Sequence, residues 1–435
     1  MPTDGEDTWV YLIEQNKYDF SSLVQKISDV FQKKQIFFQE KSVLLKISLV
    51  FPVKNPERVK MIITNPVLTM AVAEVICSRG AKVVYIGDGE TMGSARYSFK
   101  MTQMDKHLKL ISSKFRKKIK FAYLDELPRP WITPEKPFTP EIALDYPRLV
   151  REVNYFISLP KLKVNIFANI TLSIKNGMGL ISKPTRLKYH GSQLHSLIAD
   201  IYQIRPPDLV ITDAIFAGEG QGPMEASAYP TGLVIMGNNG LAVDTVCCNL
   251  MGYSPKEILH LKLLEEGGYG FLNLANISEL DHEILKKHQH EFKRPDMSLS
   301  NLAPNIHVYE GKTCKSGCKA FIRAILDGYG RNAGWNSLGE VYIILGENLK
   351  IPLEELEKLP KKRTIILGKC AEEFKNEGAY FGGCAPDYIQ MLEKIPVKTE
   401  IPITPWIKYV SLRTLLWTSL QHAVFRISRF WKKFN

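Results

Sequence analysis

SVLLKISLVF (residues 42–51) and NPVLTMAVAEVICSRGAKVVYIGDGE (residues 65–90) together indicate the architecture of this chain. The first stretch is a short apolar run with several β-branched residues, which predicts a buried strand. In the second, a proline near the start and Gly80 near the end bound a helical apolar pattern, and residues 83–88 predict another strand. A strand, a helix and a strand in this order form a βαβ unit, which predicts a parallel sheet with a right-handed crossover.

Three later segments extend this strand pattern: REVNYFISLPKLK (residues 151–163), PPDLVITDAIFAGEGQGP (residues 206–223) and GLVIMGNNG (residues 232–240). Each predicted strand runs directly into a loop of polar or glycine residues. Ligands of open parallel sheets bind outside the carboxyl ends of the strands, so we expect these loops to gather at one edge and to form the site. The first forty residues are predicted to form helices separated by polar turns.

A second, smaller α/β unit is predicted over residues 305–398, with strands in NIHVYEG, GEVYIILGENL and KKRTIILGKC. The boundary with the main domain, residues 1–300, falls near residue 300 in the polar, proline-containing stretch KRPDMSLSNLAPN. Residues 403–435 carry apolar residues at helical spacing with six Lys or Arg and no acid, which predicts a basic amphipathic helix. The expected fold is therefore α/β: a mostly parallel sheet flanked by helices, a smaller C-terminal α/β unit and an amphipathic tail.

The amino-acid composition limits the cellular compartment and the binding partners that we expect for this protein. The 435 residues include only 7 cysteines and begin without the basic start and apolar core of a secretory signal, so we expect reduced thiols in the cytoplasm. The net charge of +12 is concentrated in residues 106–120 and in the tail. Residues 405–435 are expected to contact an anionic membrane surface at its inner face, and docking on protein is the alternative. No recognised nucleic-acid-binding module is present, so no specific nucleic acid is expected.

Four cysteines lie in predicted loops of the smaller unit: Cys314, Cys318, Cys370 and Cys384. If the unit is a parallel sheet, these loops share one edge, and four thiolates there suit an iron–sulfur cluster or a zinc ion. Only one pair is close in sequence, whereas zinc sites built from cysteines alone usually use two short knuckles, so we favour a cluster, of the 4Fe–4S type. Lys315, Lys319 and the start of a helix are expected to lower the pKa of Cys318. Cys77, Cys247 and Cys248 lie in apolar helices and are expected to be buried small hydrophobes.

Polar residues also gather in the predicted loops of the main domain. Lys46, Lys161, Lys163, Asn176 and Arg186 are candidates for binding a small anionic substrate through positive charge and hydrogen bonds. Lys175, His190, Asp213 and Glu219 are the candidate catalytic residues. The alternative is an internal network of Lys–Asp ion pairs that only holds the loops together. Because Lys46 lies in the middle of an apolar run, its burial requires an anion or a carboxylate as partner.

These stretches resemble the domain of unknown function 362 family. The matching pieces are LLKISLV, TNPVLTMAVAEVICSRGAKVVYIGDGE, FISLPKLKVN, TLSIKNGMGL, RLKYHGSQLHSLIADI, PDLVITDAIFAGEGQGP and GNNGLAVDTVCCNLMGYSP, over residues 44–255. GKTCKSGC and LGKC with GGCAPD resemble the cysteine region of the branch without a ferredoxin insert. Where the family often has a histidine, this chain has Asn165. The resemblance implies a soluble α/β fold and an iron–sulfur cluster, and it implies no particular reaction.

The leading hypothesis is an iron–sulfur oxidoreductase that acts on a small anionic metabolite and exchanges electrons with a redox partner protein. The alternative is a non-catalytic binding or assembly protein with a structural metal, peripheral to a membrane. Iron, sulfide and zinc contents separate these two hypotheses.

Overall fold

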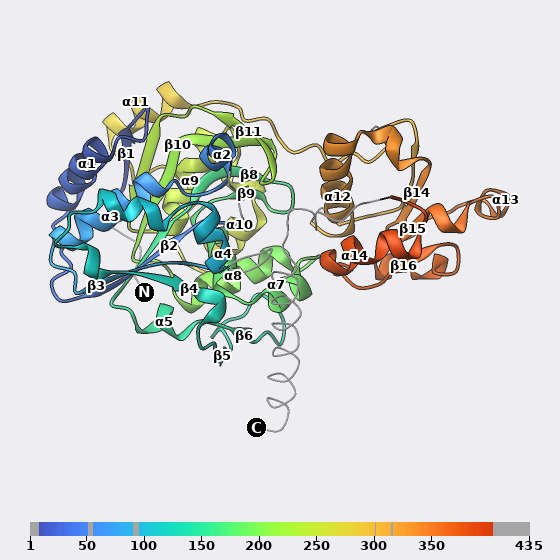
Figure 1. The fold of residues 1–435 in the computed structure, drawn as a ribbon, viewed down its shortest axis with the longest axis horizontal. Coiled ribbons are helices and arrows are strands. Elements are labelled where there is room, and N and C mark those ends of the chain that lie inside the picture. Colours follow the sequence, from blue (N-terminus) through green and yellow to red (C-terminus); the bar gives the residue numbers. More distant parts are fainter. Residues whose placement is uncertain (1–7, 51–54, 90–94, 301, 315, 403–435) are drawn as a thin grey trace. The chain divides into compact units, whose positions relative to one another are not determined.

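The computed structural model of the chain describes residues 8–50, 55–89, 95–300, 302–314 and 316–402 (Figure 1). The chain divides into two compact units. The first comprises Met1–Asn165, Asn169–Lys183 and His195–Pro295, and the second comprises Ile166–Ala168, Pro184–Leu194 and Asp296–Asn435. Two short segments of the predicted main domain therefore belong to the second unit. The predicted amphipathic helix over residues 403–435 lies outside the described residues.

The first unit is built on a large mixed sheet. Its strand order is β1 (Val10–Glu14), β12 (Leu233–Gly237), β10 (Leu209–Gln221), β7 (Tyr155–Leu159), β2 (Ser42–Ile47), β3 (Val83–Asp88) and β4 (Ile119–Tyr123). Strands β8 (Lys161–Asn165) and β11 (Glu225–Tyr229) also pair with β10, and β9 (Asn169–Thr171) pairs with β8. Pairing is parallel from β10 through β7, β2 and β3 to β4. The expectation of a mostly parallel α/β sheet is confirmed.

Two expectations about this sheet are wrong. Residues 10–14 form strand β1, which pairs antiparallel with β12, where the sequence predicted only helices in the first forty residues. Strand β12 in turn runs antiparallel to β10. The chain therefore leaves β12 in the direction opposite to the parallel strands, and the carbonyl of Gly240 just after it accepts a hydrogen bond from the Ser173 hydroxyl of the segment Ser173–Asn176 at 3.4 Å.

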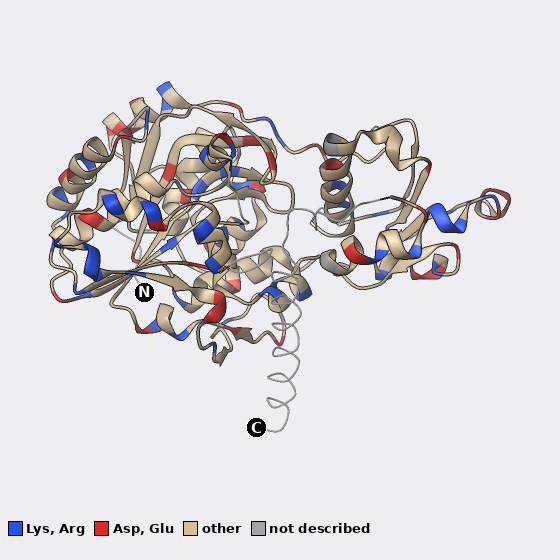
Figure 2. Cartoon of the chain, viewed as in Figure 1, with Lys and Arg blue, Asp and Glu red and all other residues tan. Residues whose placement is uncertain are grey.

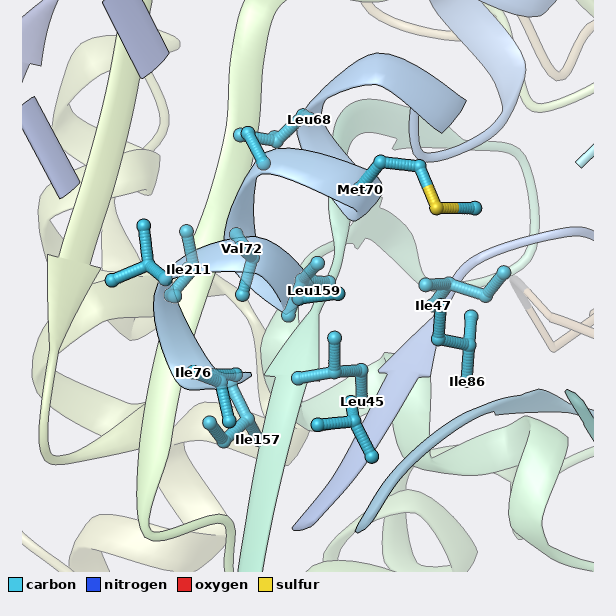
Figure 3. Packing of buried hydrophobic residues seen from close by; sticks show 14 of the residues in the cluster. Leu45, Ile47, Leu68, Met70, Val72, Ile76, Ile86, Ile157, Leu159 and Ile211 are labelled. Atoms are coloured by element: carbon cyan, nitrogen blue, oxygen red, sulfur yellow. The ribbon is translucent and has the colours of Figure 1, made fainter. Parts of the chain in front are cut away.

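The βαβ unit is present as predicted, with helix α3 (Pro66–Ser78) between β2 and β3. The Asn65 side chain caps the helix by accepting the N–H of Val67 at 2.9 Å, and Gly80 ends it with a φ of +94° that favours glycine. Figure 3 shows Leu68, Met70, Val72 and Ile76 of the helix against strand residues, Leu45, Ile47, Ile86, Ile157, Leu159 and Ile211. This apolar contact seals one face of the sheet.

Helices cover the sheet as further layers. Helix α1 (Phe20–Lys33) packs beside α3, while α9 (Gly240–Leu250) packs against β10 and β12. Cys77 of α3 and both Cys247 and Cys248 of α9 are buried, as their apolar surroundings predicted. Short helix α6 (Ser173–Asn176) contacts α9 and β7. That contact places α6 beside the ends of the parallel strands.

The second unit contains its own four-stranded parallel sheet. The order is β13 (Ile306–Glu310), β14 (Val341–Leu345), β15 (Thr364–Leu367) and β16 (Ala379–Phe381). Helix α12 (Cys318–Ala333) joins β13 to β14, and α14 (Tyr388–Lys398) follows β16. Ile344 and Ile366 of the central strands are buried with Leu359 and Phe374 in a compact core. The smaller α/β unit that the sequence predicted is therefore present.

The remaining elements are short connections. They are α2 (Pro56–Ile62), α4 (Ala95–Met101), α5 (Arg148–Glu152), α7 (Lys183–Tyr189), α8 (Leu194–Ile204), α10 (Leu259–Glu266), α11 (Glu279–His288), α13 (Leu353–Leu356), β5 (Trp131–Ile132) and β6 (Leu144–Asp145). No single helix in the described ranges is long and apolar enough to cross a membrane, although α2 and α3 pass that test as a pair bent by 60°. Lys and Arg are interspersed with Asp and Glu along the helices of both units (Figure 2).

Candidate functional site

Four lysines of the first unit form what we call the lysine cluster: Lys46, Lys161, Lys163 and Lys175. Lys46 is 1% exposed, and Lys161 and Lys163 are 0% exposed. The sequence placed Lys161 and Lys163 in a loop after a strand, but both belong to strand β8, which pairs with β10 and begins directly after Pro160. Burial of three ammonium groups in one region is costly unless acceptors and anions surround them.

Lys46 has a carboxylate partner, as its position in an apolar run required. Its Nζ lies 2.7 Å from Oδ1 of Asp88 and donates hydrogen bonds to Oδ1 of Asn176 at 3.0 Å and to the carbonyl of Ile47 at 2.8 Å. Asn176 in turn donates to the carbonyl of Lys46 at 3.0 Å and to Oγ of Ser158 at 3.1 Å. A Cβ on Gly179 would overlap the Asp88 carboxylate, so glycine permits the close approach of this segment.

Lys161 also has a carboxylate partner. Its Nζ lies 3.0 Å from Oδ1 of Asp213 and donates to the Tyr18 hydroxyl at 2.9 Å, and that hydroxyl donates to the same Asp213 oxygen at 2.9 Å. The other oxygen, Oδ2, accepts the backbone N–H of Asn65 at 2.9 Å. Burial lowers the pKa of Lys161, and the Asp213 carboxylate offsets part of that effect. This pair ties β8 and β10 to the start of α3.

Lys163 differs from both neighbours because its hydrogen-bond acceptors are neutral. Its Nζ donates to Oγ of Ser48 at 3.3 Å and to the carbonyl of Ile62. Burial lowers the pKa of Lys163 well below its usual value, and the charges of Lys175, Lys161 and Lys46 lower it further, whereas Asp88 raises it. Lys163 therefore differs from Lys46 and Lys161 in having no carboxylate within hydrogen-bonding distance among the described residues.

Lys175 and Asn176 lie on helix α6, which Asp244 of α9 holds in place. The Asp244 carboxylate is completely buried and accepts the backbone N–H groups of Ser173 at 2.8 Å and Ile174 at 3.0 Å. Burial outweighs these hydrogen bonds and raises the pKa of Asp244 from 3.8 to about 7. Lys175 is partly exposed, so the lysine cluster reaches solvent at this residue.

Asp213 and Glu219 were expected in a glycine-rich loop, and this expectation is wrong. Strand β10 continues through the glycines to Gln221 and pairs there with β11. Asp213 joins the lysine cluster, as described above. Glu219 instead accepts the backbone N–H of Lys293 at 3.1 Å and lies 3.4 Å from its Nζ and 3.6 Å from Nε2 of His290. These contacts hold the segment around residues 290–293 against β10.

Arg186 and His190 belong to the second unit and are buried or half-buried there. The His190 ring lies 4.6 Å from the Phe167 ring and 5.2 Å from the Phe321 ring, between centroids. His195 lies in the first unit, where its Nδ1 is 3.0 Å from Nδ1 of buried His260. Burial lowers the pKa of His195 to about 4, so this histidine pair is uncharged near neutral pH.

The four candidate thiols lie in the second unit, after strands of its parallel sheet. Cys314 and Cys318 follow β13, Cys370 follows β15 and Cys384 follows β16. Parallel strands place their carboxyl ends at the same edge. Burial raises the pKa of both Cys314 and Cys318, and the charges of Cys384 and Cys370 raise each of them further. Among the described residues, no three His, Cys, Asp or Glu side chains are placed to hold one metal ion.

The expectation of a low pKa for Cys318 is wrong. Burial, with the nearby thiols of Cys314, Cys384 and Cys370, raises its pKa to about 12. Cys318 does begin helix α12, but the nearby cation Lys319 is paired with Glu310 at 2.6 Å. The positive charge that was expected to favour the thiolate is therefore largely neutralised. Lys315 lies outside the described residues.

A segment of residues 190–192 packs directly against the cysteine loops within the second unit. The Ser192 hydroxyl lies 3.5 Å from Sγ of Cys384, and Oγ of Ser316 donates to the carbonyl of Gly191 at 2.9 Å. A Cβ on Gly191 would lie 2.5 Å from the backbone nitrogen of Ala385. Only glycine allows this close approach, so the segment forms one wall beside Cys384.

Residues 43–249 match the family model of a domain of unknown function, DUF362. This segment is a DUF362 domain. It includes the whole lysine cluster and residues 190–192, while the four thiols lie beyond its end.

A thylakoid-associated protein from Synechocystis sp. is 26% identical over 205 residues, which cover 45% of this chain and 59% of the relative. The chain therefore spans less than two thirds of that relative's length. A crystal structure of a Thermotoga maritima protein aligns with a TM-score of 0.33 and 8% identity over 85% of this chain and 93% of that chain.

Sequence reasoning missed several residues that shape the first unit. Asp88 stands in the Gly-Asp-Gly turn at the end of a predicted strand, and Asp244 is the one charge in an apolar helical run, so both carried a signal. Tyr18 and His260 carried no such signal in the sequence, because their roles depend on partners that are distant in sequence.

Two matched substitutions compare Lys161, which has a carboxylate partner, with Lys163, whose hydrogen-bond acceptors are neutral. Lys161→Met leaves the Asp213 carboxylate buried without its cation and is expected to cost about 3–5 kcal/mol of unfolding free energy. Lys163→Met leaves only neutral oxygens and is expected to cost about 1–2 kcal/mol. Urea denaturation of both variants measures the difference. Equal losses would show that Lys163 carries a paired charge.

The raised pKa of Asp244 predicts a pH dependence of stability. Between about pH 4 and 7 the folded state keeps a proton that the unfolded state releases, so the Asp244 contribution is fully present below pH 4 and is lost as the pH rises to 7. Asp244→Asn cannot titrate, so the stability advantage of the parent protein over this variant should shrink across that window. Urea denaturation at several pH values measures it, and an advantage that grows with pH would show that Asp244 is ionised in the fold.

Proposed function

We propose that this protein binds an iron–sulfur cluster through Cys314, Cys318, Cys370 and Cys384 and acts as an oxidoreductase on a small anionic substrate held by the lysine cluster. The observation that carries the proposal is the position of four thiols after the parallel strands β13, β15 and β16, whose carboxyl ends share one edge of the sheet. Four thiols drawn from short loops at the ends of parallel strands form a donor set typical of cluster ligation.

The surroundings of the thiols support a bound group. A Cβ on Gly317 would lie 2.6 Å from Sγ of Cys314, and a Cβ on Gly368 would lie 2.6 Å from Sγ of Cys318. Glycine at both positions keeps the sulfur atoms free of neighbouring side chains. A cluster is preferred to zinc because only Cys314 and Cys318 are close in sequence, and the other two ligands are dispersed.

The four cysteines would hold the cluster, which supplies one-electron transfer when bound. The remaining steps fall to the side chains of the first unit. Lys175, which is partly exposed, attracts the anionic group, while Asn176 beside it holds Lys46 in place because both of its amide hydrogens are already donated, to the Lys46 carbonyl and to Ser158. Asp213, hydrogen-bonded to the Tyr18 hydroxyl at 2.9 Å, is the group proposed to move a proton.

Anaerobic purification with iron, sulfide and zinc analysis tests the cluster. We expect a coloured protein with iron and sulfide, and we expect Cys318→Ser and Cys384→Ser to lose more than half of the iron. Cys77→Ala is the matched control, because Cys77 is buried in α3 and should not affect iron content. A colourless protein that contains zinc would support a structural metal instead, and a protein without metal would overturn the proposal.

The contact between Ser192 and Cys384 predicts an effect on reduction potential. A hydroxyl that donates to a ligand sulfur stabilises the reduced, more negative cluster. One hydrogen bond of about 1 kcal/mol corresponds to about 40 mV for a one-electron couple. Ser192→Ala should therefore lower the potential by about that amount, while Ser192→Thr keeps the hydroxyl and the potential. Spectroscopic redox titration measures both, and an unchanged potential in Ser192→Ala would contradict the role.

A second candidate function is suggested by the Synechocystis relative, which is a thylakoid-associated protein. In this alternative the protein is a non-catalytic binding or assembly protein, held at an anionic membrane surface by residues 405–435. Truncation after Pro402 followed by sedimentation with anionic liposomes tests it. Loss of binding on truncation supports the alternative, and unchanged binding contradicts a membrane role of the tail.

A further inference from the structure

The amino ends of strands β2, β3 and β4 bring three loops together at the edge of the sheet opposite to the lysine cluster. The strands are parallel neighbours, so the residues that precede them lie side by side. The N–H of Lys82 donates to the carbonyl of Lys41 at 2.9 Å, and Nζ of Lys118 donates to the carbonyl of Ala81 at 2.7 Å. The chain just before each of the three strands therefore contributes to one surface of the first unit.

This surface is strongly positive. Residues 106–120 include seven Lys or Arg and no Asp or Glu. Lys41, Lys82, Lys114 and Lys117 are exposed, and among the described residues none of these four forms an ion pair with a carboxylate. Exposed lysines without carboxylate partners create a positive potential that attracts anions.

The acids that adjoin these loops do not cancel this charge. Glu74 of α3 accepts the N–H of Ser112 at 2.9 Å and so holds the loop before β4 against the helix. Glu40 and Asp105 are exposed, and they are outnumbered by the lysines and arginines.

An exposed aromatic ring belongs to the same surface. Phe37, in the loop before β2, is 59% exposed. Its position is fixed by Arg79 at the end of α3, whose carbonyl accepts the N–H of Phe38 at 3.1 Å and whose guanidinium donates to the carbonyl of Ile36 at 3.2 Å. The guanidinium carbon also lies 5.6 Å from the centroid of the Phe37 ring. The fold therefore holds an apolar ring in solvent beside unpaired lysines.

We infer that this surface, which we call the basic edge (Phe37, Lys41, Lys82, Lys114 and Lys117), docks on an anionic lipid bilayer. The lysines contact the headgroups, and the Phe37 ring enters the interface between headgroups and acyl chains. A bilayer suits both features, whereas a soluble polyanion would use the lysines and leave the ring in water. The inference deepens the second candidate function, because it assigns membrane contact to a face of the first unit in addition to the tail. In this orientation the carboxyl ends of the parallel strands, with the lysine cluster, point away from the bilayer.

Sedimentation of the full chain with vesicles tests the inference, using phosphatidylcholine vesicles with and without phosphatidylserine. We expect the protein to bind only the vesicles that contain phosphatidylserine, and to bind them more weakly as the salt concentration rises. A variant that combines Lys82→Glu, Lys114→Glu and Lys117→Glu should bind at least about tenfold more weakly. Its matched control changes the net charge equally, at exposed lysines away from the basic edge, and should bind much more like the parent protein: Lys256→Glu, Lys350→Glu and Lys375→Glu. Equal losses in the two variants would overturn the inference.

Phe37→Ser tests the aromatic ring separately from charge. It should weaken binding by about fivefold at low and at high salt, because the ring contributes apolar contact and no charge. The substituted side chains are exposed, and an unchanged circular dichroism spectrum checks that each variant is folded. Unchanged binding of Phe37→Ser would contradict the insertion of the ring.

A variant that ends at Pro402 separates the basic edge from the tail. It should keep part of the binding, and the three Lys→Glu substitutions in the basic edge should then remove that part. If the shortened protein does not bind and the full chain with the three substitutions binds like the parent, the basic edge is wrong and the tail alone supports the second candidate function. If the full chain binds no vesicle, both fail, while the iron content still reports separately on the cluster. Retention on heparin without binding to vesicles would indicate a soluble polyanion as the partner and would overturn the assignment to lipid.

Discussion

Burial of ammonium groups is the constraint on which the rest of the first unit depends. An isolated charge in a protein interior costs several kcal/mol, so each buried lysine requires a fixed partner. Lys46 and Asp88 meet this need across the ends of β2 and β3. Lys161 and Asp213 meet it across β8 and β10, and the second oxygen of Asp213 also holds the first residue before α3. These ion pairs therefore hold the ends of the parallel strands together, in addition to the apolar contact between α3 and the sheet.

Charge burial also matters in the second unit, but there the neighbouring groups are thiols, which become negative when they lose a proton. Four thiols lie after β13, β15 and β16, and a negative charge on Cys370 or Cys384 makes ionisation of Cys314 and Cys318 less favourable. A cationic group among them would remove this penalty, since metal ions invert the local preference for protonation. In the protein without metal, the raised pKa of Cys318 indicates that its thiol is protonated. The raised pKa values of Cys314 and Cys318 thus arise first from burial and then from the neighbouring thiols.

The sequence predicted the parts of this structure that depend on local pattern. The βαβ unit from Ser42 to Asp88 was readable because its strands, its helix cap and Gly80 each carry a local signal, and the need of Lys46 for a carboxylate followed from burial alone. The course of β10 was not readable, because glycines usually mark loops. Glycine is needed at position 218 of this strand because a Cβ there would lie 2.7 Å from the carbonyl oxygen of Met61. Only the folded chain reveals this contact. Lys161 and Lys163 were misplaced because Pro160 separates two consecutive strands.

An ion-pair network that serves only the fold should contain matched charges. The network here pairs two lysines with two aspartates and then adds Lys163, which is buried to the same degree and receives no carboxylate. Burial of a polar group is expensive, and the hydrogen bonds of Lys163 to two neutral oxygens offset only part of that cost. The fold therefore accounts for Lys46 and Lys161 but leaves Lys163 without a structural reason.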